Sequence, residues 1–218
     1  MSVALRAGAL QHRPVAHGQV WSGGGVLNRG LTRLHLPTLP RERWANGLGW
    51  TRPVAQAADA HQGLLWRVSL AEITEAAPFS CFEGMDRTAV LVHGGPVVLQ
   101  GPDQRWCLHQ PGDEALFAGE WALSNARPEH EAMLWNVMVR RGAAQAQVRC
   151  VADQDWTAPG EGISLVWVLA GCFELAGAGQ APLRVGDGLW LPPGEVGVVL
   201  RPASSNARLL VTTVQPQA

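Results

Sequence analysis

The chain has 218 residues with 17 basic and 18 acidic side chains, which gives a net charge of −1 at neutral pH. This balance provides no general attraction to nucleic acid or to an anionic membrane surface. Hydrophobic residues make up 47% of the chain, yet no apolar run approaches the ~18 residues that a membrane-spanning helix needs. We therefore expect a soluble, globular protein without nucleic-acid or membrane partners.

Residues 1–28 differ from the rest of the chain in composition. They mix Gly, Gln, His and Pro without a sustained period and include the run Ser22-Gly23-Gly24-Gly25. We interpret this segment as an N-terminal tail that is either flexible or an irregular cover. Because its first residues contain no apolar stretch with a small-residue cleavage site, we expect the protein to be cytoplasmic.

After a first predicted strand at Leu31–Leu36, the segment Trp44–Thr51 combines two indoles, an amide, a hydroxyl and two glycines. Asn46 followed by Gly47 favours a tight turn. The two indoles offer apolar faces that are costly to leave in water. Such a turn can form the wall of a pocket. The alternative is a glycine turn that is buried by two core tryptophans.

The remainder of the chain shows the alternation of strands separated by turn residues, which predicts an all-β sandwich or barrel. In Leu65–Ile73, Arg67 and Ser69 share one face of the predicted strand. A short helix is expected only before Trp44 or near Asp153–Trp156. Further strands are predicted at Thr88–His93, Val97–Leu99, Leu116–Phe117, Met133–Arg141, Ser164–Leu169, Cys172–Leu175, Leu183–Val185, Gly188–Leu191, Val196–Leu200 and Arg208–Val214.

The two halves of the chain form an internal repeat. Leu91–Leu99 aligns with Val168–Leu175, and Gly112-Asp113 aligns with Gly186-Asp187 at nearly the same offset, which chance seldom gives. The second copy, Gly186–Gly194, resembles the Gly-Asp to Pro-Pro-Gly segment of cupins. The resemblance implies two jelly-roll halves, a bicupin. We expect a single bicupin domain at residues 29–218, with halves at about 29–149 and 150–218.

No metal or other cofactor is expected. Metal-binding cupins place His-x-His and Glu in the first motif and a further His after the Pro-x-Gly of the second. This chain has no His-x-His, and Gly197 or its neighbours stand in the place of the last His. The four cysteines are also widely spaced and form no Cys-x-x-Cys pair, so a zinc or redox site lacks its usual spacing.

Four blocks together resemble the HutD/Ves family, small bicupins associated with bacterial histidine utilisation. The blocks are Trp44–Arg52, Trp66–Ile73, Pro78–Arg87 and Asn136–Arg141, and the resemblance covers roughly Leu31–Val214. It implies a cytoplasmic protein that limits flux through histidine breakdown by binding a metabolite such as urocanate or a formylated glutamate. The alternative is a metal-free isomerase or hydrolase that acts on such a metabolite, with Asp86 or Glu72 as its base.

A small carboxylate ligand needs fixed donors and apolar walls, which arginine, asparagine and aromatic side chains supply. We expect the Trp44–Arg52 turn to form the pocket with the strands that carry Arg67, Arg87 and Asn136. For the arginines the alternative is a structural salt bridge. No catalytic residue is assigned, and the oligomeric state, monomer or homodimer, is left open. The candidate ligand-binding residues are Trp44, Asn46, Gly47, Thr51, Arg67, Ser69, Phe82, Asp86, Arg87, Asn136 and Arg140.

Overall fold

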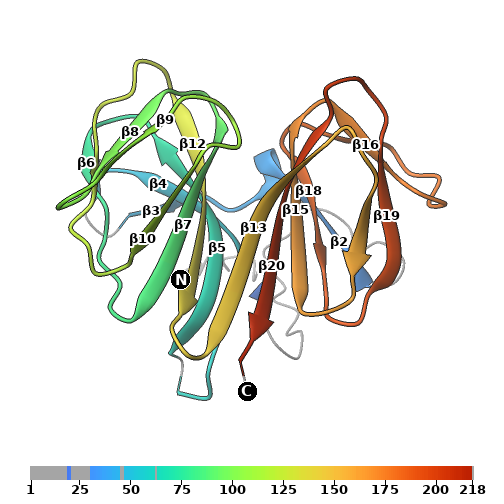
Figure 1. Cartoon of the computed structure of the whole chain (residues 1–218), viewed down its shortest axis with the longest axis horizontal. Coiled ribbons are helices and arrows are strands. Elements are labelled where there is room, and N and C mark those ends of the chain that lie inside the picture. Colours follow the sequence, from blue (N-terminus) through green and yellow to red (C-terminus); the bar gives the residue numbers. More distant parts are fainter. Residues whose placement is uncertain (1–18, 21–29, 45–46, 62, 218) are drawn as a thin grey trace, which may run out of the picture.

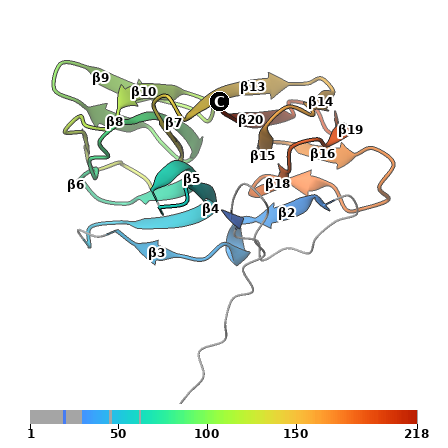
Figure 2. The same ribbon diagram turned by 90° about the horizontal axis from the view of Figure 1, so that it is seen from below.

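The computed structural model describes residues 19–20, 30–44, 47–61 and 63–217. Two β-barrels lie side by side (Figures 1 and 2). Within the described ranges no α-helix occurs and no helix is long and apolar enough to cross a membrane; a short 3-10 helix, η2 (Leu36–Thr38), precedes Trp44. The prediction of an all-β fold is therefore confirmed. Most of residues 1–28, interpreted above as a tail, lie outside the described ranges.

The N-terminal barrel consists of two antiparallel sheets. Its larger sheet has seven strands in the order β1-β4-β5-β12-β7-β10, with β3 also paired to β4; its smaller sheet has the order β6-β11-β8-β9. The strands of the larger sheet are β1 (Gln19–Val20), β3 (Glu42–Arg43), β4 (Trp50–Ala58), β5 (Leu64–Ile73), β7 (Met85–His93), β10 (Glu114–Ala118) and β12 (Ala132–Arg140). Those of the smaller sheet are β6 (Ala77–Pro78), β8 (Val97–Gln100), β9 (Arg105–Leu108) and β11 (Ser124–Asn125).

The C-terminal barrel also has two sheets, in the orders β13-β20-β15-β18-β2 and β14-β19-β16-β17. Strand β2 comes from the N-terminal part of the chain and pairs with β18 (Figure 2). The predicted dividing point at residues 149 and 150 falls inside β13. The strands are β2 (Thr32–His35), β13 (Ala144–Ala152), β14 (Trp156–Pro159), β15 (Ile163–Ala170), β16 (Cys172–Leu175), β17 (Leu183–Arg184), β18 (Asp187–Leu191), β19 (Val196–Pro202) and β20 (Arg208–Pro216).

The aligned segments of the repeat occupy matching places. β12-β7-β10 in the first barrel corresponds to β20-β15-β18 in the second. The two Gly-Asp turns also match, because Asp113 accepts backbone hydrogen bonds from His109 and Gln110, and Asp187 accepts one from the backbone of Arg184. The repeated aspartates therefore stabilise turns.

One predicted helix is wrong, and several strands, β4 among them, have no counterpart in the sequence prediction. The helix proposed near Asp153–Trp156 is wrong, because Asp153 has a positive φ of 49° and Trp156 begins β14. Strand β4 was not predicted, since Pro53 and several alanines obscure its alternation. The register of β4 against β5 shifts between Pro53 and Ala55, and such a bulge tolerates a proline within a sheet.

Strand alternation divides the apolar side chains between separate cores. One face of each large sheet lines its own barrel, and the other face packs against the second barrel. In this shared core the Trp135 and Trp167 rings lie 5.5 Å apart, and the Trp135 indole N–H donates to the Thr212 hydroxyl at 3.0 Å. Burying both tryptophans joins the two barrels while leaving the interior of each free to differ.

Candidate functional site

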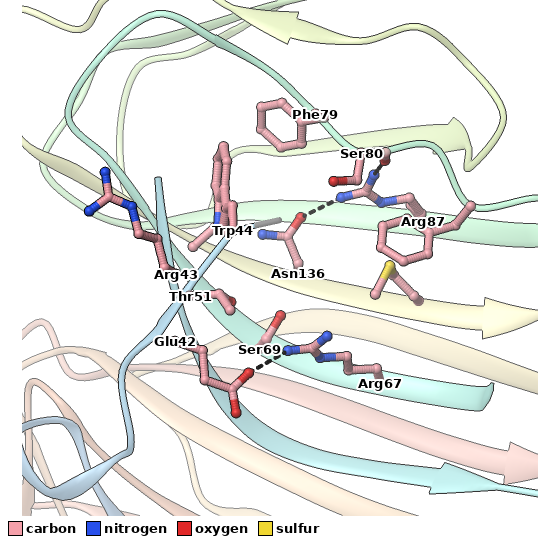
Figure 3. A pocket seen from close by; sticks show the side chains of 13 residues that line it. Glu42, Arg43, Trp44, Thr51, Arg67, Ser69, Phe79, Ser80, Arg87 and Asn136 are labelled. Carbon is pink, nitrogen blue, oxygen red and sulfur yellow. Dashed lines mark hydrogen bonds and ion pairs between the residues drawn. The ribbon is translucent and has the colours of Figure 1, made fainter. Parts of the chain in front are cut away.

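A cavity of about 220 Å³ opens into the N-terminal barrel. Strands β5, β7 and β12 supply its floor, and the β3–β4 hairpin and the segment after β6 supply its walls (Figure 3). Its lining combines three arginines and an asparagine with aromatic rings. The lining residues are Glu42, Arg43, Trp44, Thr51, Arg67, Ser69, Ala71, Phe79, Ser80, Phe82, Arg87, Asn136 and Met138.

The polar residues of the floor lie in two cross-strand rows. Met138 of β12 pairs with Arg67 on one side and with Arg87 on the other. In the neighbouring row, Asn136 pairs with Ser69. Because adjacent strands are ~4.8 Å apart, the two arginines are separated by about 10 Å at their Cα atoms. The row therefore presents two separate cationic groups on either side of a methionine.

Arg87 is a buried cation without a carboxylate partner in the described part of the chain. Its side chain is 8% exposed; Nη1 donates to the Ser80 carbonyl at 3.0 Å and Nη2 to Asn136 Oδ1 at 3.4 Å. Its Nε is buried and has no hydrogen-bond partner. Burial lowers the pKa of Arg87 to about 10, so the guanidinium stays charged at neutral pH.

Aromatic rings surround this guanidinium. Its Cζ lies 5.0 Å from the ring centre of Phe117, 5.3 Å from that of Phe82 and 5.6 Å from that of Phe79. These cation–π contacts compensate part of the lost hydration, but they leave the net charge of Arg87 unbalanced. An anion that enters the cavity would supply the missing charge.

Arg67 is held less firmly. Its nearest carboxylate is that of Glu42, whose Oε2 lies 3.5 Å from Arg67 Nη2, and the Glu42 side chain is 51% exposed. The Nε of Arg67 is buried without a hydrogen-bond partner. Burial lowers the pKa of Arg67, and the Glu42 carboxylate partly opposes that shift.

The Trp44–Thr51 segment is the tip of the β3–β4 hairpin, and its two indoles point to different places. Trp44 lines the cavity, with its ring centre 5.8 Å from that of Phe79. Gly49 permits this position, because a Cβ there would lie 2.7 Å from the Trp44 ring. Trp50 lies outside the lining, under the Arg41 guanidinium at 4.2 Å. The hairpin thus supplies one aromatic wall to the cavity.

Seven of the eleven ligand-binding residues predicted from the sequence line this cavity, and three others that the structure describes do not. Asn46 lies outside the described residues, and Gly47 bends the hairpin with a φ of 72° without reaching the lining. Asp86 lies on the opposite face of β7 from Arg87, and its carboxylate pairs with Arg141 at 2.7 Å. Arg140 pairs with Asp59 at 2.7 Å, because it lies at the end of β12 beside the β4–β5 turn. Asp86 and Arg140 therefore form structural salt bridges, which was the alternative to ligand contact.

Six lining residues were not singled out from the sequence. Ala71 and Met138 continue the alternation of Arg67 and Asn136, so the period of two could have identified them. Strand β3 is too short for a periodic signal. Phe79 and Ser80 belong to the irregular segment after β6, where no simple period predicts the direction of a side chain. The six are Glu42, Arg43, Ala71, Phe79, Ser80 and Met138.

The donor set of the cavity does not fit a metal cation. Its charged lining residues are arginines and one half-exposed glutamate, whereas transition metals need several His, Cys or carboxylate ligands. Among the residues that the structure describes, no cluster of three or more His, Cys, Asp or Glu could hold a metal ion. The proposed bases also lie outside the lining: Glu72 pairs with Arg41 and Arg52, and Asp86 pairs as given above.

The sequence matches a known family over most of its length. A family model described as HutD matches residues 37–210. Protein Ves from Citrobacter koseri is 34% identical over 141 residues, which cover 63% of this chain and 72% of that protein. Protein Ves from Escherichia fergusonii is 30% identical over 138 residues, with the same shares covered.

Solved structures match the fold. HutD from Pseudomonas fluorescens SBW25 has a TM-score of 0.72 at 21% identity, covering 86% of this chain and 100% of that one. The conserved protein of unknown function PA5104 from Pseudomonas aeruginosa PAO1 has a TM-score of 0.70 at 22% identity, covering 85% and 98%. The pirin YhhW from Escherichia coli, in complex with nickel(II), has a TM-score of 0.55 at 12% identity, covering 86% and 100%. These matches confirm the predicted cupin architecture.

Proposed function

The chain belongs to the HutD family of cupins, a family associated with bacterial histidine utilisation, and we propose that its N-terminal barrel binds a small carboxylate metabolite of histidine breakdown. Urocanate and formylated derivatives of glutamate are the ligand types considered. Through this binding the protein would sense the metabolite and regulate flux through the pathway in the cytoplasm.

The observation that supports the proposal is the Arg87 guanidinium. It is buried beside a cavity, it has no ion-pair partner among the described residues, and its Nε has no acceptor. Removing a charge from water without a counter-charge is costly. A ligand carboxylate can accept from a guanidinium through two hydrogen bonds, and it would compensate this charge.

The remaining lining suits a small, partly flat molecule. Trp44, Phe79 and Phe82 offer ring faces for stacking. Asn136 is oriented by Arg87 and donates weakly from Nδ2 to the Leu134 carbonyl at 3.3 Å, so its amide has a further hydrogen available to a ligand. A volume of about 220 Å³ accommodates a small metabolite.

Binding without catalysis agrees with the chemistry of the lining. Among its residues there is no histidine or cysteine, and neither Ser69 nor Ser80 has a base in hydrogen-bond contact with its hydroxyl in the described part of the chain. Nucleophilic catalysis by a hydroxyl needs such a pair, and the one carboxylate of the lining, that of Glu42, is paired with Arg67. The proposal is therefore a binding protein in which the metabolite changes stability or interactions and is not converted.

A thermal-shift and calorimetric screen tests the proposal. Histidine, urocanate, formiminoglutamate, formylglutamate and glutamate are each added to the protein and to its Arg87→Met variant. At ~100 times its dissociation constant, the true ligand stabilises the fold by roughly 2.7 kcal/mol, or about 5 to 10 °C in Tm. We expect Arg87→Met to abolish this response and the exposed control Arg127→Met to retain it. No response to any carboxylate, or an unchanged response in Arg87→Met, would refute the proposed function.

A further inference from the structure

We propose that the cavity takes a ligand with two acid groups, one on Arg87 and one on Arg67, and that Glu42 occupies the place of the second acid group in the free protein. This inference rests on the proposed function and adds the charge class of the ligand. It also gives the β3–β4 hairpin a role, since Glu42 lies in β3 and competes with the ligand from within the chain.

In the free protein the two guanidinium groups do not converge on one point (Figure 3). The two arginines lie on β5 and β7, on opposite sides of Met138 of β12, and about 10 Å separates their Cα atoms across two strand spacings. In Figure 3 the guanidinium of Arg87 points toward Asn136, whereas that of Arg67 points toward Ser69 and Glu42. Each arginine therefore presents its donors to a different end of the cavity.

Both guanidinium groups carry unused donors. Arg87 uses its two terminal nitrogens for Ser80 and Asn136, and Nε is left without an acceptor. Arg67 makes no side-chain hydrogen bond to the described residues, and its Nε is buried as well. A guanidinium has five N–H donors, so two groups in this state indicate two missing acceptors.

Glu42 has the geometry of a replaceable partner. Its carboxylate lies 3.5 Å from Arg67 Nη2 and is 51% exposed, which is too long for a strong hydrogen bond and close enough to screen the cation. Strand β3 has two residues and pairs with β4, so the Glu42 side chain can turn into solvent without breaking a core contact. A ligand carboxylate that reaches Arg67 would displace it.

Glutarate and valerate form a matched pair of probes, because valerate replaces one carboxylate by a methyl group. Their dissociation constants are measured by calorimetry with the full chain and with the variants Arg67→Met, Glu42→Gln and Glu75→Gln. Glu75 is an exposed glutamate that pairs with Arg127, so its variant controls for the change in net charge.

We expect glutarate to bind about 10- to 100-fold more tightly than valerate, the value of a charge-assisted hydrogen bond. Arg67→Met should remove this preference by weakening glutarate alone. Glu42→Gln should tighten glutarate about two- to fivefold, the range of a half-exposed ion pair, and leave valerate unchanged. Glu75→Gln should change neither constant.

Three results would overturn the inference. Equal binding of the two acids that still depends on Arg87 would keep the proposed function and exclude a second acid group. A glutarate constant that Glu42→Gln leaves unchanged or weakens would show that Glu42 is not a competitor; this substitution is at an exposed position, so it can be read even if Arg67→Met fails to fold. Failure of every carboxylate to bind would remove the proposed function together with this inference.

Discussion

The two barrels share a strand order but differ in what occupies the corresponding interior positions. In the N-terminal barrel, Asn136 of β12 pairs with Ala89 of β7. In the C-terminal barrel, Val211 of β20 pairs with Val166 of β15 at the equivalent place. An amide that faces the cavity therefore corresponds to a valine that is 1% exposed within an apolar cluster.

The same difference holds on the next strand. Arg87 pairs with Phe117 of β10, and its counterpart Ser164 pairs with Leu191 of β18. The interior of the C-terminal barrel is filled by buried apolar side chains, among them Leu191 and Phe173. The C-terminal copy of the repeat is therefore packed with apolar side chains, whereas the N-terminal copy keeps polar groups around a cavity.

The largest expected contrast comes from placing a carboxylate at the two matched positions. Val211→Asp puts an unpaired charge into an apolar interior and should lower the free energy of unfolding by ~3 to 5 kcal/mol. Asn136→Asp places the same group about where the Asn136 amide oxygen lies, 3.4 Å from Arg87 Nη2. This substitution should raise the free energy of unfolding by roughly 1 kcal/mol. Denaturant unfolding measures both changes.

Asn136→Asp should also weaken binding of the carboxylate ligand by at least ~10-fold, because Arg87 then has an internal counter-charge. Calorimetry with the ligand found in the screen measures this loss. Equal destabilisation by the two substitutions would mean that the N-terminal barrel is packed like its partner, and the contrast between them would disappear.

A smaller contrast is expected for the phenylalanines of the two interiors. Phe173 is 0% exposed, and Phe173→Leu should cost about 1 to 2 kcal/mol of unfolding free energy because it leaves a void. Phe82 lines the cavity and already borders open space, so Phe82→Leu should cost less, about 0.5 to 1 kcal/mol, chiefly through the lost contact of its ring with Arg87. Ligand affinity should show the reverse order when both variants are titrated. A Phe82 variant that is destabilised as strongly as Phe173→Leu would identify its ring as core.

Part of this site could be predicted from strand periodicity alone. Alternation in Leu65–Ile73 places Arg67 and Ser69 on one face, and the structure puts both on the cavity floor. Recognition of the family from its four sequence blocks is confirmed by the matching family model. These successes share a cause, since each depends on residues that are close together in the chain.

The parts that could not be predicted depend on register or on short elements. No period within one strand reveals that Arg67 and Arg87 flank Met138, because that arrangement follows from pairing between strands. The orientation of Trp50 would have followed from the alternation of β4, had Pro53 not concealed the strand. Arg140 shares a face with Asn136 but lies at the end of β12, where its Nη1 is 2.7 Å from Asp59 Oδ2.

The smallest expected contrast concerns two Gly-Glu pairs, Gly119-Glu120 and Gly194-Glu195, which follow the two Gly-Asp turns at nearly the same offset. Glu120 accepts from both terminal nitrogens of Arg141, at 2.7 and 2.6 Å, and from the Gly84 backbone N–H at 2.9 Å. Within the described residues, its counterpart Glu195 has no ion-pair partner. The Arg141 hydrogen bonds are the main cause that lowers the pKa of Glu120 from its ordinary 4.5 to about 2.

A carboxyl group whose pKa is lower in the folded state binds protons more readily when the chain is unfolded, so it stabilises the fold above the unfolded-state pKa. That stabilisation is present above pH 4.5 and is lost as the pH falls toward 2, the two pKa values of Glu120. Glu120→Gln should therefore lower the Tm at about pH 7, and this effect should shrink as the pH falls below 4.5 and be small at about pH 2. Glu195→Gln should leave the Tm unchanged at every pH. A pH-independent effect of Glu120→Gln would show that the charge of Glu120 does not hold this turn of the N-terminal barrel.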